Sequence, residues 1–590
     1  MDAFSAEQRV TALADTAPGL GRRSLLVGAA GAAGGVAAAA LFPTPARAVA
    51  GAVEPGASYF VPTEPIRLCD TRNAQVGIGF RRINSVTVRL HVGGNSVVPA
   101  NAVAVALTVT GVNLNNGGNW LSAYPSDRAW PGTASSNSET FDQRIANLVT
   151  VKLGRGASGV NGALDLRSMA PSHVVVDLAG YYVPTATTVT SGRFEPKDPV
   201  RLLDTRTTGK LRAGGITTVR LNGHVPNDAI AAVVNITAVE TGNGGYVTAY
   251  PRGAKRPLAS SLNYGRGENR GAAAMVKLAT VSGVQGFDLY TLSSAHVVVD
   301  LMGYMTGPGG NPSAEGLFVP IDPQRLLDTR STRRRIWPGG TVTFGLPAAI
   351  RPRAKAVAMN LAVAATINAG YFTASAAQTP RKFVSSLNAI RAGQTVANHA
   401  FSRVSTAGVS CFTQGGAHII GDVTGWYTGT PARTTTAPPF NPPPPGGPIP
   451  WIVSIPRLGL TKWVFDGDAN RTVDAGHVWH WTGTGLVGEG ADISLFGHRT
   501  EHGGPLRYQH ALRAGDLLYI NTSDARRYTY RFARTEFLGS SWPASILTVT
   551  RRVPGETVSL ISCSKSNWQP TDTRYRLITT FTLVGWDDLG

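Results

Sequence analysis

Apolar and polar residues alternate with a period of two over much of the chain between residues 49 and 429. Residues 103–110 and 233–239 show this pattern, and each is followed by a turn rich in Asn and Gly and then by a segment with an aromatic residue. Few segments show the longer period of an amphipathic helix. Because side chains on a strand point to alternate faces, the pattern predicts antiparallel strands and an all-β fold.

Self-similarity divides this region into three units. A hexapeptide that begins with Arg-Leu and ends with Asp-Thr-Arg occurs three times, at residues 67–72, 201–206 and 325–330. Each copy is matched further on by a segment that begins with His and ends with Asp, at residues 173–177, 296–300 and 418–422. Units of this length can each bury a core of their own. We therefore predict three tandem β-sandwich or barrel-like repeats, at residues 49–185, 186–308 and 309–429.

The recurring polar residues of the hexapeptide have two interpretations. Asp204 and Arg206 flank Thr205, so they can pair with each other or cap a turn. Recurrence at one position of three units favours such an architectural role, and a ligand site repeated three times is the alternative. The units resemble a β-rich repeat domain of exported proteins from high-GC Gram-positive bacteria, a resemblance that implies a location and no particular activity.

The ends of this region are marked by changes in composition. Residues 430–450 are rich in Pro and Thr, which favours an extended linker and sets off a final domain at residues 451–590. At the start, Arg22-Arg23 precedes an Ala/Gly-rich run at 25–42 and the small-x-small sequence Ala46-Arg47-Ala48. We interpret residues 1–48 as a twin-arginine signal peptide and expect an extracellular or envelope-associated protein. An uncleaved membrane anchor is the alternative, although the run is short and weakly hydrophobic.

Charge separates the repeats from the final domain. Residues 49–429 hold 35 Lys and Arg against 20 Asp and Glu, whereas residues 451–590 hold 15 against 13. A basic exported region is attracted to anionic wall polymers or lipid head groups. Nucleic acid is not expected as a partner, because no basic-aromatic cluster or known binding motif is present.

The three cysteines are too few and too scattered for a disulfide framework or a zinc site. Cys69 occupies a position where the other two hexapeptides have leucine, and Cys411 lies in an apolar stretch, so both are expected to pack as small hydrophobic residues. Cys563 differs, because His498 precedes it and Arg574 and Arg576 follow it, each in an apolar, β-like segment. A thiol nucleophile, an imidazole that shuttles protons and a guanidinium that holds an oxyanion are the groups that cysteine acyl transfer needs.

Residues 451–590 resemble a sortase, the cysteine transpeptidase that attaches exported proteins to the Gram-positive envelope. The resemblance rests on five segments in the same order, at residues 455–459, 476–484, 494–499, 512–516 and 562–578. It implies an eight-stranded β-barrel, a sorting-motif peptide as substrate, an amine of the envelope as acceptor, and no metal or organic cofactor. The family pattern identifies Cys563 as the nucleophile and His498 as the proton donor. It selects Arg576 over Arg574, because Arg576 directly precedes Leu-Ile.

The remaining residues of this domain leave some alternatives open. Ser562 stands where the family usually has threonine, which retains the hydroxyl. The other histidines of the domain and two further arginines are expected at turns, on the surface or along the substrate groove, namely His477, His480, His502, His510, Arg499 and Arg507. A non-enzymatic envelope-binding protein with a degenerate sortase domain is the competing function. The other class of peptidoglycan cysteine enzyme would need a Ser-His-Gly-Cys run, which is absent.

Overall fold

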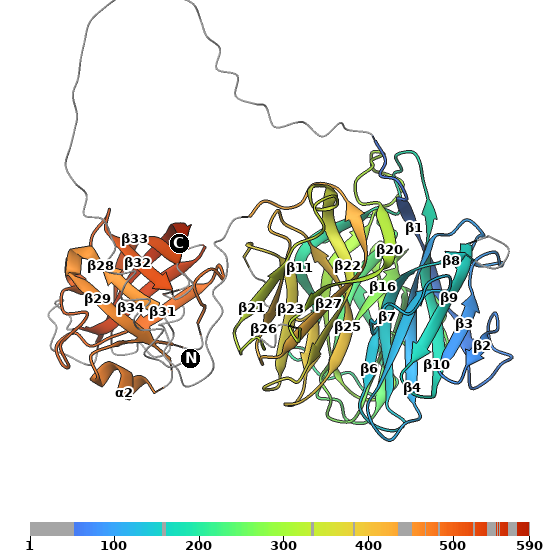
Figure 1. Ribbon diagram of the computed structural model, residues 1–590, viewed down its shortest axis with the longest axis horizontal. Coiled ribbons are helices and arrows are strands. Elements are labelled where there is room, and N and C mark those ends of the chain that lie inside the picture. Colours follow the sequence, from blue (N-terminus) through green and yellow to red (C-terminus); the bar gives the residue numbers. More distant parts are fainter. Residues whose placement is uncertain are drawn as a thin grey trace, which may run out of the picture. The chain divides into compact units, whose positions relative to one another are not determined.

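The structure is a computed structural model of the chain and is almost entirely β (Figure 1). It describes residues 52–155, 161–331, 335–380, 384–434, 451–466, 468–481, 484–522, 526–539, 550, 553, 555–564 and 575–588. Two compact units are present, one made mainly of residues 53–445 and one that follows the linker. The all-β prediction is confirmed. The signal peptide, most of the linker and Arg574 lie outside the described residues, so predictions about them stay predictions.

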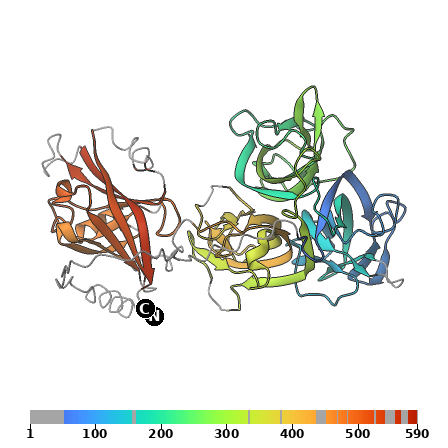
Figure 2. The ribbon, with the colours of Figure 1, turned by 90° about the horizontal axis from the view of Figure 1, so that it is seen from above.

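The N-terminal unit contains five sheets, arranged as three pairs of layers that Figure 2 shows as three neighbouring lobes. In each pair one layer consists of four long strands, here called the inner sheet, and the other, the outer sheet, consists of shorter strands. The inner sheets of the first and third pairs are joined through β1 (Ser58–Asp70) and β20 (Phe318–Asp328) into one eight-stranded sheet. The inner sheets are β1 (Ser58–Asp70), β10 (Ser172–Pro184), β4 (Ala104–Asn113) and β7 (Arg144–Lys152); β11 (Phe194–Asp204), β19 (His296–Met305), β13 (Ala231–Val239) and β16 (Arg270–Lys277); and β20 (Phe318–Asp328), β27 (His418–Thr428), β22 (Ala354–Ala364) and β25 (Val396–Arg403).

The outer sheets cover one face of each inner sheet. They are β2 (Arg81–Asn84), β3 (Thr87–His91), β9 (Asn161–Ser168), β5 (Asn119–Pro125), β6 (Ser136–Ser138) and β8 (Gly154–Arg155); β12 (Ile216–Arg220), β18 (Val284–Thr291), β14 (Gly245–Pro251), β15 (Leu262–Tyr264) and β17 (Ala279–Val281); and β21 (Thr341–Phe344), β26 (Val409–Thr413), β23 (Gly370–Ala376) and β24 (Leu387–Ala389). A 3₁₀ turn, η1 (Arg351–Arg353), precedes β22.

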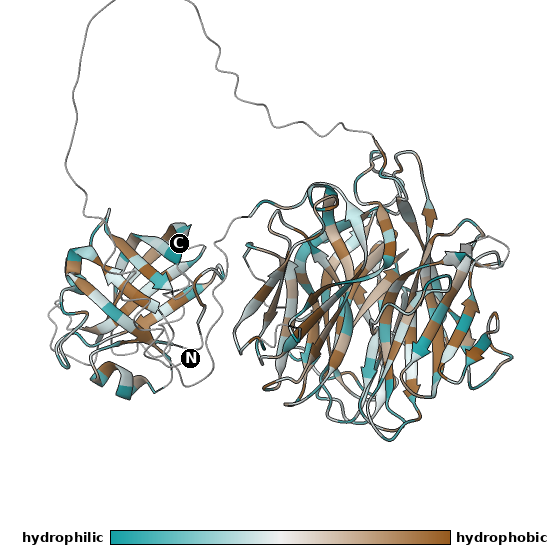
Figure 3. Cartoon of the chain, viewed as in Figure 1, coloured by the Kyte–Doolittle hydropathy of each residue, from teal (hydrophilic) through white to brown (hydrophobic). Residues whose placement is uncertain are grey.

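The inner sheets are buried on both faces. One face packs on the outer sheet of the same pair, as Val234 and Ile236 of β13 do. The other face belongs to a cluster that draws residues from all three inner sheets, Phe60, Phe194 and Phe318 among them. Strands such as β13 therefore consist almost wholly of buried residues, and Figure 3 shows hydrophobic residues concentrated along the strands.

Three glycines allow this shared cluster to close. A Cβ atom added at Gly180 would lie 2.3 Å from the ring of Phe60, one at Gly303 would lie 2.4 Å from the ring of Phe194, and one at Gly425 would lie 2.2 Å from the ring of Phe318. Real Cβ contacts are never so short, so each phenylalanine ring lies where only glycine leaves room. This contact explains the glycine that precedes an aromatic residue at the end of each unit.

The hexapeptide residues make contacts inside their own inner sheet. Its first arginine pairs with the aspartate of the closing strand, as Arg325 does with Asp422 at 2.8 Å. The threonine hydroxyl lies beside a histidine ring and accepts a backbone N–H of the closing strand, as in the bond from Ile419 to Thr329. The aspartate pairs with the last arginine of the hexapeptide. In the second hexapeptide this arginine, Arg206, lowers the pKa of Asp204 to about 2. These are architectural contacts.

Cys69 and Cys411 are buried in the cores of the first and third sheet pairs of the N-terminal unit, as predicted. Burial raises the pKa of both thiols to about 12. Both side chains therefore stay protonated at neutral pH and serve as small hydrophobic residues.

A buried histidine of the N-terminal unit predicts a pH-dependent stability. Nε2 of His399 on β25 lies 3.1 Å from the hydroxyl of Thr150 on β7. Burial lowers the pKa of His399 from 6.5 to about 3. As the pH falls below 6.5, His399 binds a proton in the unfolded chain but not in the folded chain. The free energy of unfolding therefore decreases by about 1.4 kcal/mol per pH unit.

We therefore expect the melting temperature of the N-terminal unit to fall between pH 7 and pH 4.5, as measured by calorimetry of the whole chain. His399→Gln removes the titrating ring and keeps a group that can hydrogen-bond to Thr150, so its melting temperature should change less over the same range. An equal pH dependence in both proteins would show that His399 is not the cause.

The C-terminal unit is a closed barrel of eight strands, as predicted (Figure 1). In order around the barrel these are β28 (Trp451–Ile455), β29 (Leu460–Phe465), β30 (Val478–His480), β31 (Asp492–Phe496), β34 (Thr557–Ser564), β35 (Tyr575–Asp588), β33 (Arg526–Leu538) and β32 (Leu517–Thr522). Between strands the described residues include the short helix α2 (Ala469–Asp474) and the 3₁₀ turns η2 (Pro456–Leu458) and η3 (Gln509–Ala511). Within the described part of the chain, no helix is long and apolar enough to span a membrane.

Candidate active site

Cys563 and Arg576 face each other across two neighbouring strands of the barrel. Cys563 lies near the end of β34, Arg576 lies near the start of β35, and the two residues are direct partners in the antiparallel register. Direct partners project to the same face of a sheet with Cβ atoms about 4.5–5.5 Å apart. The barrel therefore brings a thiol and a guanidinium together from two separate segments of the sequence.

His498 approaches the same end of β34 from its other side. β31 runs parallel to β34, with Phe496 opposite Ile561, and the N–H of Gly497 continues the ladder by donating to the carbonyl of Ile561 at 3.2 Å. The paired ladder ends there, and His498 and Cys563 each lie two residues beyond its last pair, Phe496 and Ile561.

Arg499 ties the histidine segment to the cysteine strand. Its guanidinium donates from Nη1 to the carbonyl of Cys563 at 3.4 Å and to the hydroxyl of Ser564 at 3.0 Å. Only 1% of Arg499 is exposed, so the expectation that it serves the surface or the substrate groove is wrong. Burial lowers the pKa of Arg499, and charge on the neighbouring Cys563 acts in the opposite direction.

Gln509 holds the strands on which Cys563 and Arg576 lie. Its buried side-chain amide donates to the carbonyls of Leu560 on β34 at 2.9 Å and Leu577 on β35 at 3.2 Å. Its side-chain oxygen accepts a hydrogen bond from Ser562, the residue that stands where the family usually has threonine. The hydroxyl of the residue next to Cys563 therefore makes a hydrogen bond within the barrel, and a serine at this position can make it.

An apolar layer lies next to Cys563 and Arg576 on the same face of the strands. Ile561 and Ile578 are register partners, each two residues from the cysteine or the arginine, and both are buried. Trp481, Phe496 and Leu538 pack against them. Polar groups that react beside such a layer interact more strongly than they do in water, because few water molecules compete with them.

The ring of His498 is held by a carboxylate. Its Nε2 lies 2.9 Å from Oδ1 of Asp474, the last residue of α2. Between the described residues, no hydrogen bond joins this ring to the thiol of Cys563. Contacts between catalytic groups are often long before substrate binds, so the separation does not exclude a joint role.

The other histidines of this unit occupy different surroundings. His480 is 2% exposed, and its ring lies 2.7 Å from Asp466 and 3.0 Å from the carbonyl of Gly485, so its expected place at a turn or on the surface is wrong. His477 is half-buried against Phe465. His502 and His510 are exposed, as expected, and Nδ1 of His510 accepts a hydrogen bond from Arg499.

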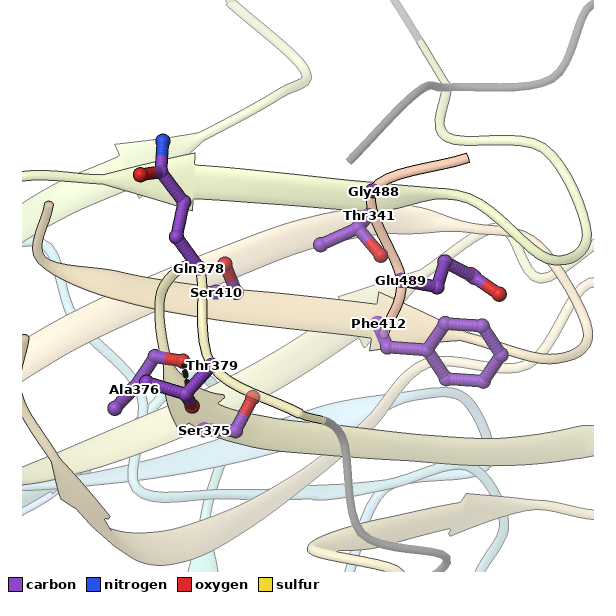
Figure 4. A pocket seen from close by; sticks show the side chains of 9 residues that line it. All are labelled: Thr341, Ser375, Ala376, Gln378, Thr379, Ser410, Phe412, Gly488 and Glu489. Carbon is purple, nitrogen blue, oxygen red and sulfur yellow. Dashed lines mark hydrogen bonds between the residues drawn. The ribbon is translucent and has the colours of Figure 1, made fainter. Parts of the chain in front are cut away.

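A small pocket elsewhere in the structure lacks these features (Figure 4). It is lined mostly by small and hydroxyl-bearing side chains, and Thr379 donates a hydrogen bond to the carbonyl of Ala376 inside it. The lining residues are Thr341, Ser375, Ala376, Gln378, Thr379, Ser410, Phe412, Gly488 and Glu489. They include no cysteine, histidine or arginine, so the barrel holds the stronger candidate site.

Comparison with known proteins agrees with the barrel geometry. Residues 453–584 match the family model described as the sortase domain. The C-terminal unit is therefore a sortase domain with the transpeptidase fold of that family. No curated protein sequence matches the chain.

Solved structures similar to this chain are also sortases. Sortase E1 from Streptomyces coelicolor, solved with a tripeptide in its active site, is 25% identical over 23% of this chain and 88% of its own, with a TM-score of 0.21. The SrtA sortase from Actinomyces oris is 20% identical over 26% of this chain and 90% of its own, with a TM-score of 0.24. Sortase C-3 from Streptococcus pneumoniae is 22% identical over 23% of this chain and 64% of its own, with a TM-score of 0.21.

Proposed function

We propose that the chain is an exported cysteine transpeptidase that cleaves a C-terminal sorting motif and transfers the acyl group to an amine of the cell envelope. The observation that carries the proposal is the cross-strand pairing of Cys563 with Arg576 in a sortase domain, with His498 following β31, the strand that pairs with β34 on its other side. Intact residues at all three positions speak against a degenerate, non-enzymatic domain.

The reaction proceeds in two acyl transfers. The Cys563 thiolate attacks the carbonyl carbon of the sorting motif, the C–N bond breaks, and His498 as imidazolium gives its proton to the departing amine. The enzyme then holds a thioester. An envelope amine attacks this thioester, loses a proton to His498 and forms the new amide, which regenerates the thiolate.

Arg576 and the surrounding residues serve this chemistry in separate ways. Arg576 hydrogen-bonds the substrate backbone or the oxyanion that develops on the carbonyl. Arg499 donates to the backbone carbonyl of Cys563 and so fixes the position of this residue on β34. The apolar layer of Ile561 and Ile578 lowers the local concentration of water, which favours an amine over water as the acceptor.

A fluorogenic sorting-motif peptide tests the proposed function. The chain should release the fluorophore slowly with water alone and faster when an amine such as triglycine is added, with the ligated product visible by mass spectrometry. Binding of the peptide without cleavage would instead support the non-enzymatic alternative. Hydrolysis at a rate that added amine does not change would identify a peptidase.

We also propose that the repeats hold the enzyme on anionic wall polymers. Their excess of 15 positive charges supports this role. Partly exposed aromatic pairs that can contact sugar rings also support it, because two of the outer sheets have one: Trp120 with Trp130, and Tyr246 with Tyr290. Arginines lie over both of these pairs, Arg167 at 5.4 Å and Arg256 at 3.9 Å from a ring centre.

This attachment should depend on salt. Attraction between exposed charges is screened within about 8 Å at physiological salt, so high salt should release residues 49–429 from isolated cell walls. Residues 451–590, with nearly balanced charge, should bind weakly at every salt concentration. A pelleting assay over a salt series measures both fragments. Equal binding by the two, or binding of the repeats that salt does not change, would show that their positive charge is incidental.

Export by the twin-arginine route completes the proposal. Arg22-Arg23 would direct a folded chain outward, and Ala48 would be the last residue removed. Sequencing the N-terminus of the exported protein tests the cleavage site. A mature protein that begins at its original Met1 would favour the membrane-anchor alternative.

A further inference from the structure

Three donor side chains gather at one side of the candidate site. Nε2 of His498 lies 2.9 Å from Oδ1 of Asp474, and Nε2 of His502 lies 3.7 Å from the same oxygen. One donor atom from each residue lies within 4.8 Å of the other two. Asp474 ends α2, whereas both histidines follow β31, so the cluster joins two separate elements.

The backbone at His502 adopts an unusual conformation. Its φ of 50° lies in the left-handed region, which few residues other than glycine adopt. Its ring stacks on that of His498 with the ring centres 5.0 Å apart. A hydrogen bond from His498 to Asp474 that merely orients the His498 ring would not explain why a second imidazole lies at the same carboxylate.

The donor set suits a transition-metal ion. Two imidazole nitrogens and one carboxylate oxygen are ligands that Zn²⁺ binds at 2.0–2.2 Å, with a fourth position for water. In a tetrahedral site, donor atoms at such distances lie about 3.4 Å from one another. The 2.9 Å and 3.7 Å separations lie on either side of this value, so small side-chain rotations suffice to seat an ion.

We propose that Asp474, His498 and His502 bind a divalent transition-metal ion such as Zn²⁺, and that the bound ion inhibits the enzyme. The ion takes the lone pair of Nε2 of His498, so this ring can no longer become the imidazolium that protonates the departing amine. The inhibition rests on the proposed function, whereas the metal site stands on the donor geometry alone.

Metal binding is tested first and without reference to activity. The full chain, freed of metal by a chelator, is titrated with Co²⁺, whose visible absorption reports the number and kind of ligands, and with Zn²⁺ in competition. We expect one ion per chain in a four-coordinate site with nitrogen and oxygen ligands. His502→Ala and Asp474→Asn should each weaken binding by about 100-fold or more, which exceeds the usual effect of losing a residue that only supports a ligand.

His477→Ala is the matched control, because His477 is a neighbouring histidine that packs on Phe465 and lies outside the cluster. It should keep the affinity of the unaltered chain. An absorption band from a thiolate ligand would place the ion on Cys563 and overturn the proposal. So would unchanged affinity in His502→Ala, or no binding at all.

Inhibition is tested second, with the sorting-motif peptide. Each protein is compared with its own rate in chelator, and Zn²⁺ should inhibit the unaltered chain and His477→Ala at similar concentrations. The concentration needed should rise by about 100-fold in His502→Ala, in step with affinity. Equal inhibition of all three proteins would refute control through this site. Metal binding that needs His502, in a chain with no transpeptidase activity, would refute the proposed function and leave the metal site standing.

Discussion

Cys563→Ala should abolish thioester formation while leaving the barrel folded. The substitution removes the one atom that can attack the sorting motif, and it changes little volume at a half-buried position on β34. The adjacent hydroxyl of Ser562 cannot take over, because it is buried and donates to Gln509. Mass spectrometry of the intact chain after incubation with a sorting-motif peptide should show an acyl adduct in the unaltered protein and none in the variant.

The two other cysteines are the controls for this experiment. Cys69→Ala and Cys411→Ala each remove a thiol that is buried in the N-terminal unit and protonated at neutral pH. Each should cost about 1 kcal/mol of stability and leave the rate per folded molecule unchanged. Peptide cleavage retained by Cys563→Ala would refute the thioester mechanism.

Arg576→Ala should lower the turnover rate by about 10²–10³-fold, the usual effect of losing one donor to an oxyanion. Arg576 faces Cys563 across the strand pair, so its fork of N–H groups can reach the carbonyl that the thiolate attacks. Arg576→Lys should not restore the rate, because an ammonium group cannot supply two parallel hydrogen bonds. Single-turnover measurements of thioester formation separate this effect from acceptor binding.

Arg574→Ala is the matched control, two residues away in the sequence. It should lower the rate far less than Arg576→Ala does. The opposite ranking would assign the role to Arg574 and would mean that the family pattern misleads at this position.

The resemblance to a known family predicted the eight-stranded barrel, because the motifs that carry it are local in the sequence. His498, Cys563 and Arg576 each lie in a short apolar segment with a recognisable motif, and strand pairing alone brings such segments together. Pairing in a closed barrel leaves little freedom in register, since a shift by one residue would turn every side chain to the other face.

The supporting residues could not be predicted in the same way. Arg499, Gln509 and His480 are types that usually lie at the surface, and no pattern in the sequence marks them as buried. Their burial follows from long-range contacts, such as the hydrogen bonds from Gln509 to β34 and β35. The sequence shows Arg499 directly after His498, but it does not show that Arg499 hydrogen-bonds to Ser564 on another strand.

For the N-terminal region, periodicity predicted strands but not their common core. Alternation of apolar and polar residues is typical of a sheet with one face exposed to solvent. β13 and its counterparts are instead buried on both faces. Their long apolar runs, such as Ala-Ala-Val-Val at residues 231–234, were the signal for a second packing partner. Which surface would cover that face depends on the three units meeting, and a pattern within one unit does not contain that information.

The shared phenylalanine cluster has a consequence for how this array can change in evolution. In a solenoid each copy contacts only its neighbours, so copies can be gained or lost singly. Here all three inner sheets contribute to one cluster, and Phe60, Phe194 and Phe318 each come from a different copy. Deleting any copy would open that cluster to water, and a fourth would find no place in it. The three inner sheets are therefore coupled, and the loss of any one of them would destabilise the other two.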